Sequence, residues 1–290
     1  MRCVVGIDLG STTTKAVLVD EAGEVVGRGI TNSRSNYEVA SAVARDEALT
    51  AARFEILERA VGRAGGGNGG GRGKVVDELL RAFRLEIYLE QLAELRKEIL
   101  GSLAAPFMAQ WRQQLEPAVE KILEQAEDEA PQLFAAGAER RSDFFRDIAG
   151  AAYTAGAERA AREDGVPFDR AVSLFDRAIL DVETRLLPQT FADRLRRAAA
   201  RVRAGGSEPA DLPLPQVIDK VVATPIEEQS FVGTGYGRQT LPFPKQAVRS
   251  EILCHGRGAY NFFPGTRTPS TICGRENRHS CRPSQNPQHP

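Results

Sequence analysis

The run from Asp8 to Lys15 contains residue types that bind the phosphate groups of a nucleotide. Gly10 allows the backbone to approach a ligand without a Cβ atom in the way. Lys15 adds a positive charge suited to terminal phosphates. Donors for phosphate oxygens come from the backbone amides and hydroxyls of Ser11, Thr12, Thr13 and Thr14. We predict a phosphate-binding turn at residues 10–15, called the phosphate turn below; a hairpin with a polar tip is the alternative.

Asp8 follows an apolar stretch, where an isolated carboxylate would be costly. A magnesium ion would compensate this charge, because Mg²⁺ keeps several of its waters and needs only one or two protein carboxylates beside substrate phosphates. We therefore predict that Asp8 is the catalytic residue and holds hydrated Mg²⁺ through water.

Short β-branched runs flank the phosphate turn. Residues 3–7, 16–19 and 24–30 are separated by Gly, Ser and Asp, a pattern typical of a meander of three strands. Residues 1–37 are therefore predicted to form a β-rich unit that carries the phosphate turn between its first two strands.

Helical spacing of apolar residues begins at Glu38 and continues to about Val61. Residues 65–73 are glycine-rich, and we interpret them as a flexible linker. A P-loop is disfavoured, because Lys74 is followed by Val75 where that motif requires Ser or Thr.

Nearly all of residues 75–203 has helical spacing, with interruptions expected at Pro106 and Pro117. We predict that residues 38–213 form a large all-α insertion. The aromatic residues within it are interpreted as core, not as a cofactor site.

Strand signals return in residues 217–224 and 230–232. The second run leads into a glycine-rich stretch, residues 233–238, which we interpret as a ligand-facing turn with a plain tight turn as the alternative. A helix is expected over residues 249–260, and residues 214–268 are predicted to complete the β-rich lobe. Cys254 and His255 are adjacent, so on a helix they face different ways and do not form a metal pair.

The arrangement of Asp8, Gly10, Ser11 and Lys15 between hairpin strands resembles the first phosphate motif of the actin, Hsp70 and sugar kinase superfamily. The resemblance implies an α/β fold built on an RNase-H-like ATPase lobe, with ATP and Mg²⁺ between two lobes. It implies a ligand but not a reaction.

Residues 31–37, 233–238, 251–259 and 263–268 are similar to the ATPase subunits of benzoyl-CoA reductase and to the activators of 2-hydroxyacyl-CoA dehydratases. The long helical insertion, including residues 88–92, resembles the larger reductase ATPase subunit, called A or gamma.

The resemblance implies an ATP-hydrolysing subunit of an oxidoreductase that drives low-potential electrons from ferredoxin into the reduction of benzoyl-CoA, as in anaerobic degradation of aromatic compounds. The implied partners are a second, D-like ATPase subunit and two substrate-reducing subunits. A 4Fe–4S cluster held between the two ATPase subunits is implied for the family.

The resemblance ends at Thr268, where the family continues with a second phosphate motif, the cluster cysteines and an adenosine-binding lobe. Residues 269–290 have no apolar period and are expected to be a disordered tail. We therefore expect a truncated form that lacks the second lobe and is inactive alone. Cys273, Cys281 and His279 match no metal-site spacing, so no Fe–S ligand is assigned in this chain.

The 38 basic and 39 acidic residues nearly balance, which argues against nucleic acid or an anionic membrane as a partner. The four cysteines form no paired framework, and no basic leader precedes the first strand, so a cytoplasmic location is expected. Two other functions remain open, a sugar or acyl kinase of the same superfamily and a non-catalytic nucleotide-binding scaffold.

Overall fold

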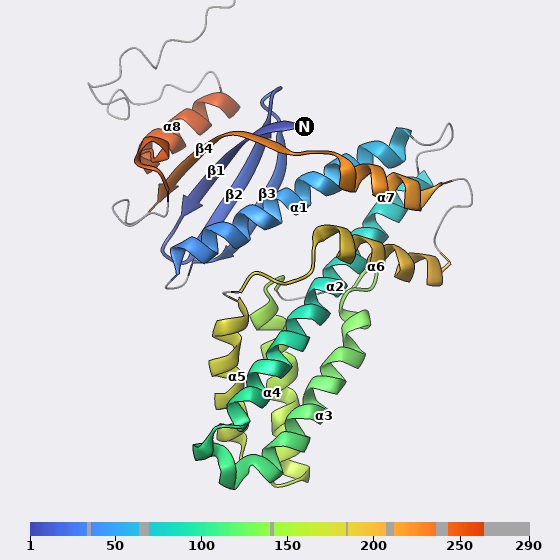
Figure 1. Ribbon diagram of the computed structural model, residues 1–290, viewed down its shortest axis with the longest axis vertical. Helices are drawn as coiled ribbons and strands as arrows, with labels where there is room; N and C mark the ends of the chain where they lie inside the picture. The colour runs from blue at the N-terminus through green and yellow to red at the C-terminus, as the bar shows by residue number, and fades with distance from the viewer. Residues whose placement is uncertain are drawn as a thin grey trace, which may run out of the picture.

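The computed structural model describes residues 1–33, 36–63, 70–139, 142–183, 185–206, 212–235 and 243–263. A sheet lobe lies at one end of the molecule and a bundle of helices at the other (Figure 1). The described part is mixed α/β, with one four-stranded sheet and eight α-helices.

The predicted meander is confirmed. Its strands are β1 (Arg2–Leu9), β2 (Thr13–Asp20) and β3 (Val25–Asn32), and both β1–β2 and β2–β3 pair antiparallel. A fourth strand, β4 (Glu227–Gly235), pairs in parallel with β1, so the sheet order is β3-β2-β1-β4. Where β1 and β4 begin, the Glu227 amide donates a hydrogen bond to the Met1 carbonyl over 2.8 Å.

Helix α1 (Tyr37–Arg63) covers one face of the sheet (Figure 1). It presents a stripe of small buried residues, Ala44, Ala48 and Ala52, to strand β3. A Cβ atom added to Gly27 or Gly29 would overlap the backbone of α1. Glycine on the strand and alanine on the helix therefore allow an unusually close approach, and the opposite face of the sheet is left for the residues of the predicted site.

Helix α2 (Gly70–Leu103) runs from the sheet lobe into the bundle and contributes to two separate cores. Its first half, with Leu79 and Phe83, packs with α1, α6 (Phe191–Ala204) and α7 (Leu214–Ala223). Ion pairs lie at the boundary between the two cores, where the buried Glu86 of α2 binds Arg197 and Arg201 of α6.

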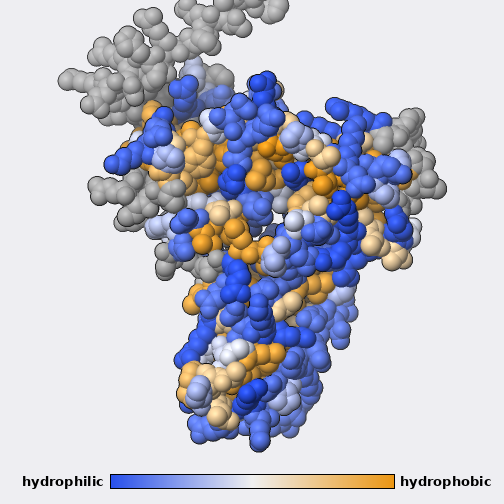
Figure 2. Space-filling view, in the orientation of Figure 1, coloured by the Kyte–Doolittle hydropathy of each residue, from blue (hydrophilic) through white to orange (hydrophobic). Residues whose placement is uncertain are grey.

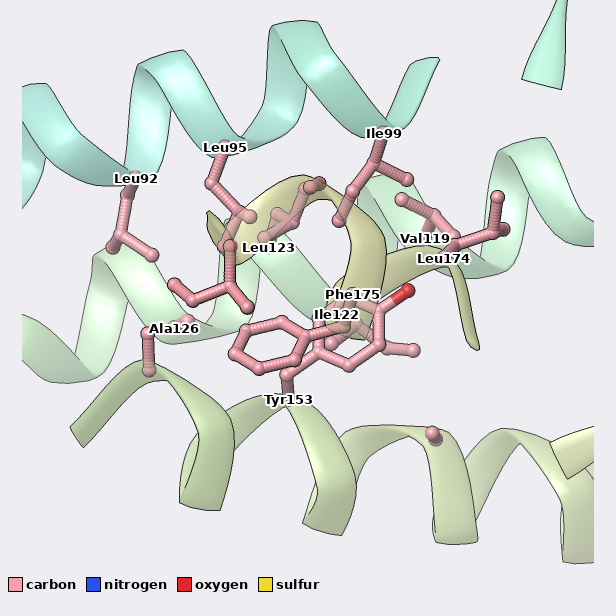
Figure 3. Packing of buried hydrophobic residues seen from close by; sticks show 14 of the residues in the cluster. Leu92, Leu95, Ile99, Val119, Ile122, Leu123, Ala126, Tyr153, Leu174 and Phe175 are labelled. Atoms are coloured by element: carbon pink, nitrogen blue, oxygen red, sulfur yellow. The ribbon is translucent and has the colours of Figure 1, made fainter. Parts of the chain in front are cut away.

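The second half of α2 packs with α3 (Ala109–Leu133), α4 (Phe145–Glu163) and α5 (Phe168–Glu183). A short 3-10 turn, η1 (Pro106–Met108), links α2 to α3. Figure 3 shows leucine and isoleucine side chains of α2 and α3 meeting Tyr153 of α4 and Phe175 of α5, whose rings stack at 5.0 Å. The interpretation of these aromatic residues as core is confirmed.

The strand expected over residues 217–224 is wrong, because this segment lies in α7. Its buried residues Leu214, Val217, Ile218 and Val221 recur at helical spacing and pack against α1 and α6. Pro215 in the first turn favours a helix start, since the amide that proline lacks has no helical partner there. Tertiary packing therefore outweighed the strand preference of the β-branched run.

Three smaller expectations also need correction. Pro117 lies inside α3 and does not interrupt it, because neighbouring residues of the same helix, including Leu115 and Val119, are buried in the bundle. Residues 233–235 of the expected turn belong to β4. Helix α2 already begins at Gly70, within the glycine-rich stretch, whereas residues 64–69 lie outside the described part.

The helix expected over residues 249–260 is confirmed as α8 (Glu251–Phe262), which follows the short turn η2 (Lys245–Ala247) and lies beside β4 (Figure 1). Residues 264–290 are outside the described part, so the prediction for the tail stays a prediction. Over the described ranges, every helix is too short or too polar to pass through a bilayer.

Candidate functional site

The phosphate turn is a tight hairpin between β1 and β2. The Gly10 amide donates to the Thr13 carbonyl over 3.1 Å, which leaves Ser11 and Thr12 exposed at the tip. A Cβ atom on Gly10 would lie 2.7 Å from the Thr13 carbonyl oxygen, closer than real Cβ contacts. Gly10 is therefore required by the turn itself, in addition to any approach of a ligand.

Asp8 and Lys15 are direct neighbours across β1 and β2. Both alternate with the buried residues that face α1, so their side chains lie on the opposite face of the sheet. Asp8 is half-buried and Lys15 is exposed. The sheet thus brings the predicted metal-holding carboxylate and the predicted phosphate-binding ammonium together, one residue pair before the turn closes.

Thr14 differs from the other residues of the turn. Its side chain is fully buried, and its hydroxyl lies 2.9 Å from the hydroxyl of the buried Ser33. The Ser33 amide also donates to the Thr12 carbonyl over 2.9 Å. The Thr14 hydroxyl therefore holds the turn against the end of β3, and a contact of Thr14 with a phosphate group is expected through its backbone amide.

Ser33 was not singled out by the sequence pattern. Its role depends on the register that places Asn32, the last residue of β3, opposite Thr13. In the sequence, Ser33 could be noticed as a hydroxyl residue directly after a predicted strand. It is linked to Thr14 only once the register between β2 and β3 is known.

Strand β4 brings a second glycine-containing segment to the site. Thr234 pairs with Asp8 and Gly235 pairs with Leu9. Gly235 has a φ of 136°, and a Cβ atom there would overlap the Leu9 backbone, so only glycine allows this approach. The Thr234 hydroxyl donates to the Arg249 carbonyl over 3.0 Å, which anchors the segment before α8. The rest of the predicted ligand-facing turn, from residue 236, lies outside the described part.

A hydrated magnesium ion fits the donor set of this face. Asp8 offers one carboxylate, and a Mg²⁺ ion that is bound mainly by water and phosphate oxygens needs no more than one or two. Among the described residues no cluster of three His, Cys, Asp or Glu side chains that could hold a metal ion occurs.

The cysteines that the structure describes are Cys3 and Cys254. Cys3 is buried in the core between the sheet and α1, where burial raises the pKa of its thiol. Cys254 lies half-buried on α8. Cys273, Cys281 and His279 are outside the described part. The structure therefore assigns no Fe–S ligand among the described residues.

A cleft of about 1190 Å³ lies beside the site, between the β2–β3 side of the sheet lobe and the bundle. Figure 2 shows the sheet lobe as the broader part of the molecule and the bundle as the narrower part. Lys15 and Ile30 line the cleft from the sheet, Glu47 from α1 and Arg84 from α2. Glu47 accepts a hydrogen bond from the Ile30 amide. Its side chain stays accessible to solvent, yet the protein atoms that crowd the carboxyl displace enough water to raise its pKa to about 7.

Comparisons with known proteins give one match. Searches of curated proteins and of solved structures found no similar protein. The sequence model of the BadF/BadG/BcrA/BcrD ATPase family matches residues 5–279, which include every described strand and helix from β2 to α8 and β1 from Val5 onward. By this match, the chain belongs to the BadF/BadG/BcrA/BcrD ATPase family.

Proposed function

We propose that the chain binds Mg·ATP at the phosphate turn and couples ATP hydrolysis to electron transfer in a benzoyl-CoA reductase. The observation that carries the nucleotide site is the pairing of Asp8 with Lys15 on the open face of the sheet, beside the turn that requires Gly10. Family membership supports an ATP-binding role.

Each residue of the turn has a distinct proposed role. Gly10 shapes the turn, and the amides and exposed side chains of Ser11 and Thr12 contact phosphate oxygens. Thr13 contributes its backbone, and Lys15 binds a terminal phosphate. Asp8 holds hydrated Mg²⁺, which would offset phosphate charge when bound. The Thr14 hydroxyl contributes only by fixing the turn through Ser33.

The oxidoreductase part of the proposal rests on the resemblance of the segments at residues 31–37, 233–238 and 251–259 to reductase ATPase subunits, together with family membership. The proposed partners are a D-like ATPase subunit, two substrate-reducing subunits and ferredoxin as electron donor. In the proposed assembly the aromatic ring is reduced in those partners, as the resemblance implies.

Nucleotide binding is tested by calorimetric titration of the full 290-residue chain with ATP in excess Mg²⁺, for the wild type and the variants Asp8→Asn and Lys15→Met. We expect each variant to weaken binding by about tenfold or more, since each removes a charge from an ion or a phosphate. Circular dichroism of each variant is compared with that of the wild type to check that the variant is folded.

Asp128→Asn and Lys74→Met are matched controls, because both side chains are exposed on helices outside the sheet. They should bind Mg·ATP like the wild type. Equal affinity in Asp8→Asn, Lys15→Met and the controls would contradict the proposed site, as would an absence of binding to the wild-type chain.

The coupling is tested with the four reductase subunits. The chain should co-purify with the D-like subunit, and the assembled complex should reduce benzoyl-CoA only with ATP and reduced ferredoxin. ATP-dependent phosphorylation of a sugar or a carboxylate by the chain alone would instead support a kinase, and nucleotide binding without association would support a scaffold.

A further inference from the structure

One row of residues crosses the whole sheet at the candidate site. The strand registers place Ile30 of β3 beside Lys15 of β2, Lys15 beside Asp8 of β1, and Asp8 beside Thr234 of β4. Neighbouring strands lie about 4.8 Å apart, so a shift of the β3 backbone displaces Lys15 directly. The two predicted ligand-binding residues are thus the centre of this row.

Both ends of the row are held by groups from outside the sheet. At the β4 end, the Thr234 hydroxyl donates to the Arg249 carbonyl. At the β3 end, the Ile30 amide donates to a Glu47 carboxylate oxygen over 2.8 Å. Strand β3 is the edge of the sheet, so the amides on its outer side have no strand to pair with. For the Ile30 amide, the Glu47 carboxylate of α1 takes the place of a strand partner.

Close packing fixes Glu47 at this position. A Cβ atom on Gly29 would lie 2.8 Å from the Glu47 Cβ atom, so the missing side chain of Gly29 gives Glu47 the room to reach the neighbouring Ile30 amide. The contact therefore depends on the same glycine that lets α1 approach β3.

We propose that Glu47 is a positioning residue for the nucleotide site, which sets the placement of Lys15 and Asp8 by holding the β3 edge at Ile30. The proposal rests on the proposed function, since it assigns Glu47 to the same site. Glu47 itself does not touch the nucleotide; it acts through the strand pairing.

The hydrogen bond from Ile30 is strongest when Glu47 is ionised, because a charged acceptor roughly doubles the strength of such a bond. Charged groups on its own helix and on other elements line the same cleft as Glu47. These groups are Asp46 on α1, Lys15 on β2, Arg28 on β3, Arg84 on α2, Asp143 before α4, Glu183 and Arg185 at the end of α5, and Arg194 on α6.

Partial loss of hydration in the cleft raises the pKa of Glu47 most, and the hydrogen bond from the Ile30 amide lowers it. Of the charged groups, Asp46 raises and Arg84 lowers this pKa, which comes to about 7. The backbone positions of Ile30, Lys15 and Asp8 should therefore change between pH 6 and 8. These positions should be constant over that range when residue 47 cannot ionise.

The direct test follows backbone amide signals of the isotope-labelled full chain by nuclear magnetic resonance as pH is varied, without nucleotide. We expect the amides of Ile30, Lys15 and Asp8 to shift with one common midpoint near 7. The variant Glu47→Gln should remove this midpoint, whereas Asp46→Asn, the neighbouring control on the same helix, should keep it. A midpoint at Ile30 that does not reach Lys15 and Asp8 would overturn the proposal.

The second readout is Mg·ATP affinity by calorimetry at pH 6, 7 and 8. Glu47→Ala should weaken binding about fivefold at pH 8, the effect of losing one hydrogen bond. Glu47→Gln keeps a neutral acceptor and should restore part of this loss. The ratio of wild-type to Glu47→Gln affinity should fall from pH 8 to pH 6, and this ratio cancels the titration of ATP itself.

The two proposals fail in different ways. If the wild-type chain does not bind Mg·ATP, the proposed function fails, and with it the role of Glu47 in nucleotide binding, even where the amide midpoint is shared. If the wild type binds but Glu47→Ala binds equally well at all three pH values, only the role of Glu47 is overturned.

Discussion

Replacement of Arg194 by Met should destabilise the junction between the two helical cores more than any exposed arginine replacement. Arg194 of α6 donates through its Nε to Glu90 of α2 over 2.8 Å, and the exposed fractions of the two side chains are 7% and 5%. The other Glu90 oxygen accepts from the Gln189 amide over 3.0 Å. Arg194→Met removes the basic partner of this ion pair and leaves the Glu90 carboxylate buried.

The expected cost follows from that burial. Breaking one side of a buried ion pair costs about 3–5 kcal/mol, because a charge remains without its partner. One hydrogen bond to Glu90 remains, from Gln189, so we expect a value near the lower end, about 3 kcal/mol. At roughly 2–4 °C per kcal/mol for a unit of this size, the melting temperature should fall by about 6–12 °C.

Thermal and urea unfolding followed by circular dichroism measure this change. Arg112→Met is the matched control, since Arg112 pairs with Glu116 at an exposed position of α3 and its loss should cost less than about 0.5 kcal/mol. Adding Glu90→Gln to Arg194→Met removes the buried charge and should recover part of the stability. A cost below about 1 kcal/mol for Arg194→Met, or no recovery in the double variant, would refute this reasoning.

Three further predictions concern the sheet and its helices. Gly29→Ala should lower the free energy of unfolding by more than about 2 kcal/mol, because the new Cβ atom meets the α1 backbone; urea unfolding measures this, and a neutral effect would contradict the packing. The pKa of Glu47 is raised from 4.5 to about 7, so the protonated carboxyl contributes its full stability below about pH 4.5, and this contribution is lost as pH rises through about 7. The free energy of unfolding of Glu47→Gln should therefore increase relative to that of the wild type between pH 5 and pH 8. A difference between the two proteins that does not change with pH would refute the assignment. Gly101→Ala should stabilise α2 by about 0.5–1 kcal/mol in thermal melts, since open space surrounds this helical position, and a loss would show an unrecognised contact.

The local features of the sheet lobe could be predicted from sequence because they depend on short-range patterns. Alternating apolar residues separated by Gly, Ser and Asp identified β1, β2 and β3, and the period of alanine and other apolar residues identified α1. The pairing of Asp8 with Lys15 also follows from the hairpin, since a tight turn fixes the register of its strands.

Features that depend on long-range packing could not be predicted in this way. Segment 217–224 has a β-branched composition, yet its burial against α1 and α6 makes it helical. The contact of Glu47 with Ile30 and that of Thr14 with Ser33 need the placement of α1 and the register of β3, and neither is encoded in local spacing. For the same reason, local spacing could not show that the Thr14 hydroxyl is buried against Ser33.

The most direct test of the central claim, that residues 10–15 beside Asp8 form a Mg·ATP site, replaces Mg²⁺ by paramagnetic Mn²⁺ in a nuclear magnetic resonance titration of the full chain. The account predicts that Mn·ATP broadens the amide signals of Asp8, Gly10 and Lys15 first, and leaves the bundle signals of α3 and α4 unchanged. Mn²⁺ without ATP should broaden them much less, because a single carboxylate holds the ion weakly. Broadening that begins elsewhere in the chain, or none at the phosphate turn at saturating Mn·ATP, would contradict the account.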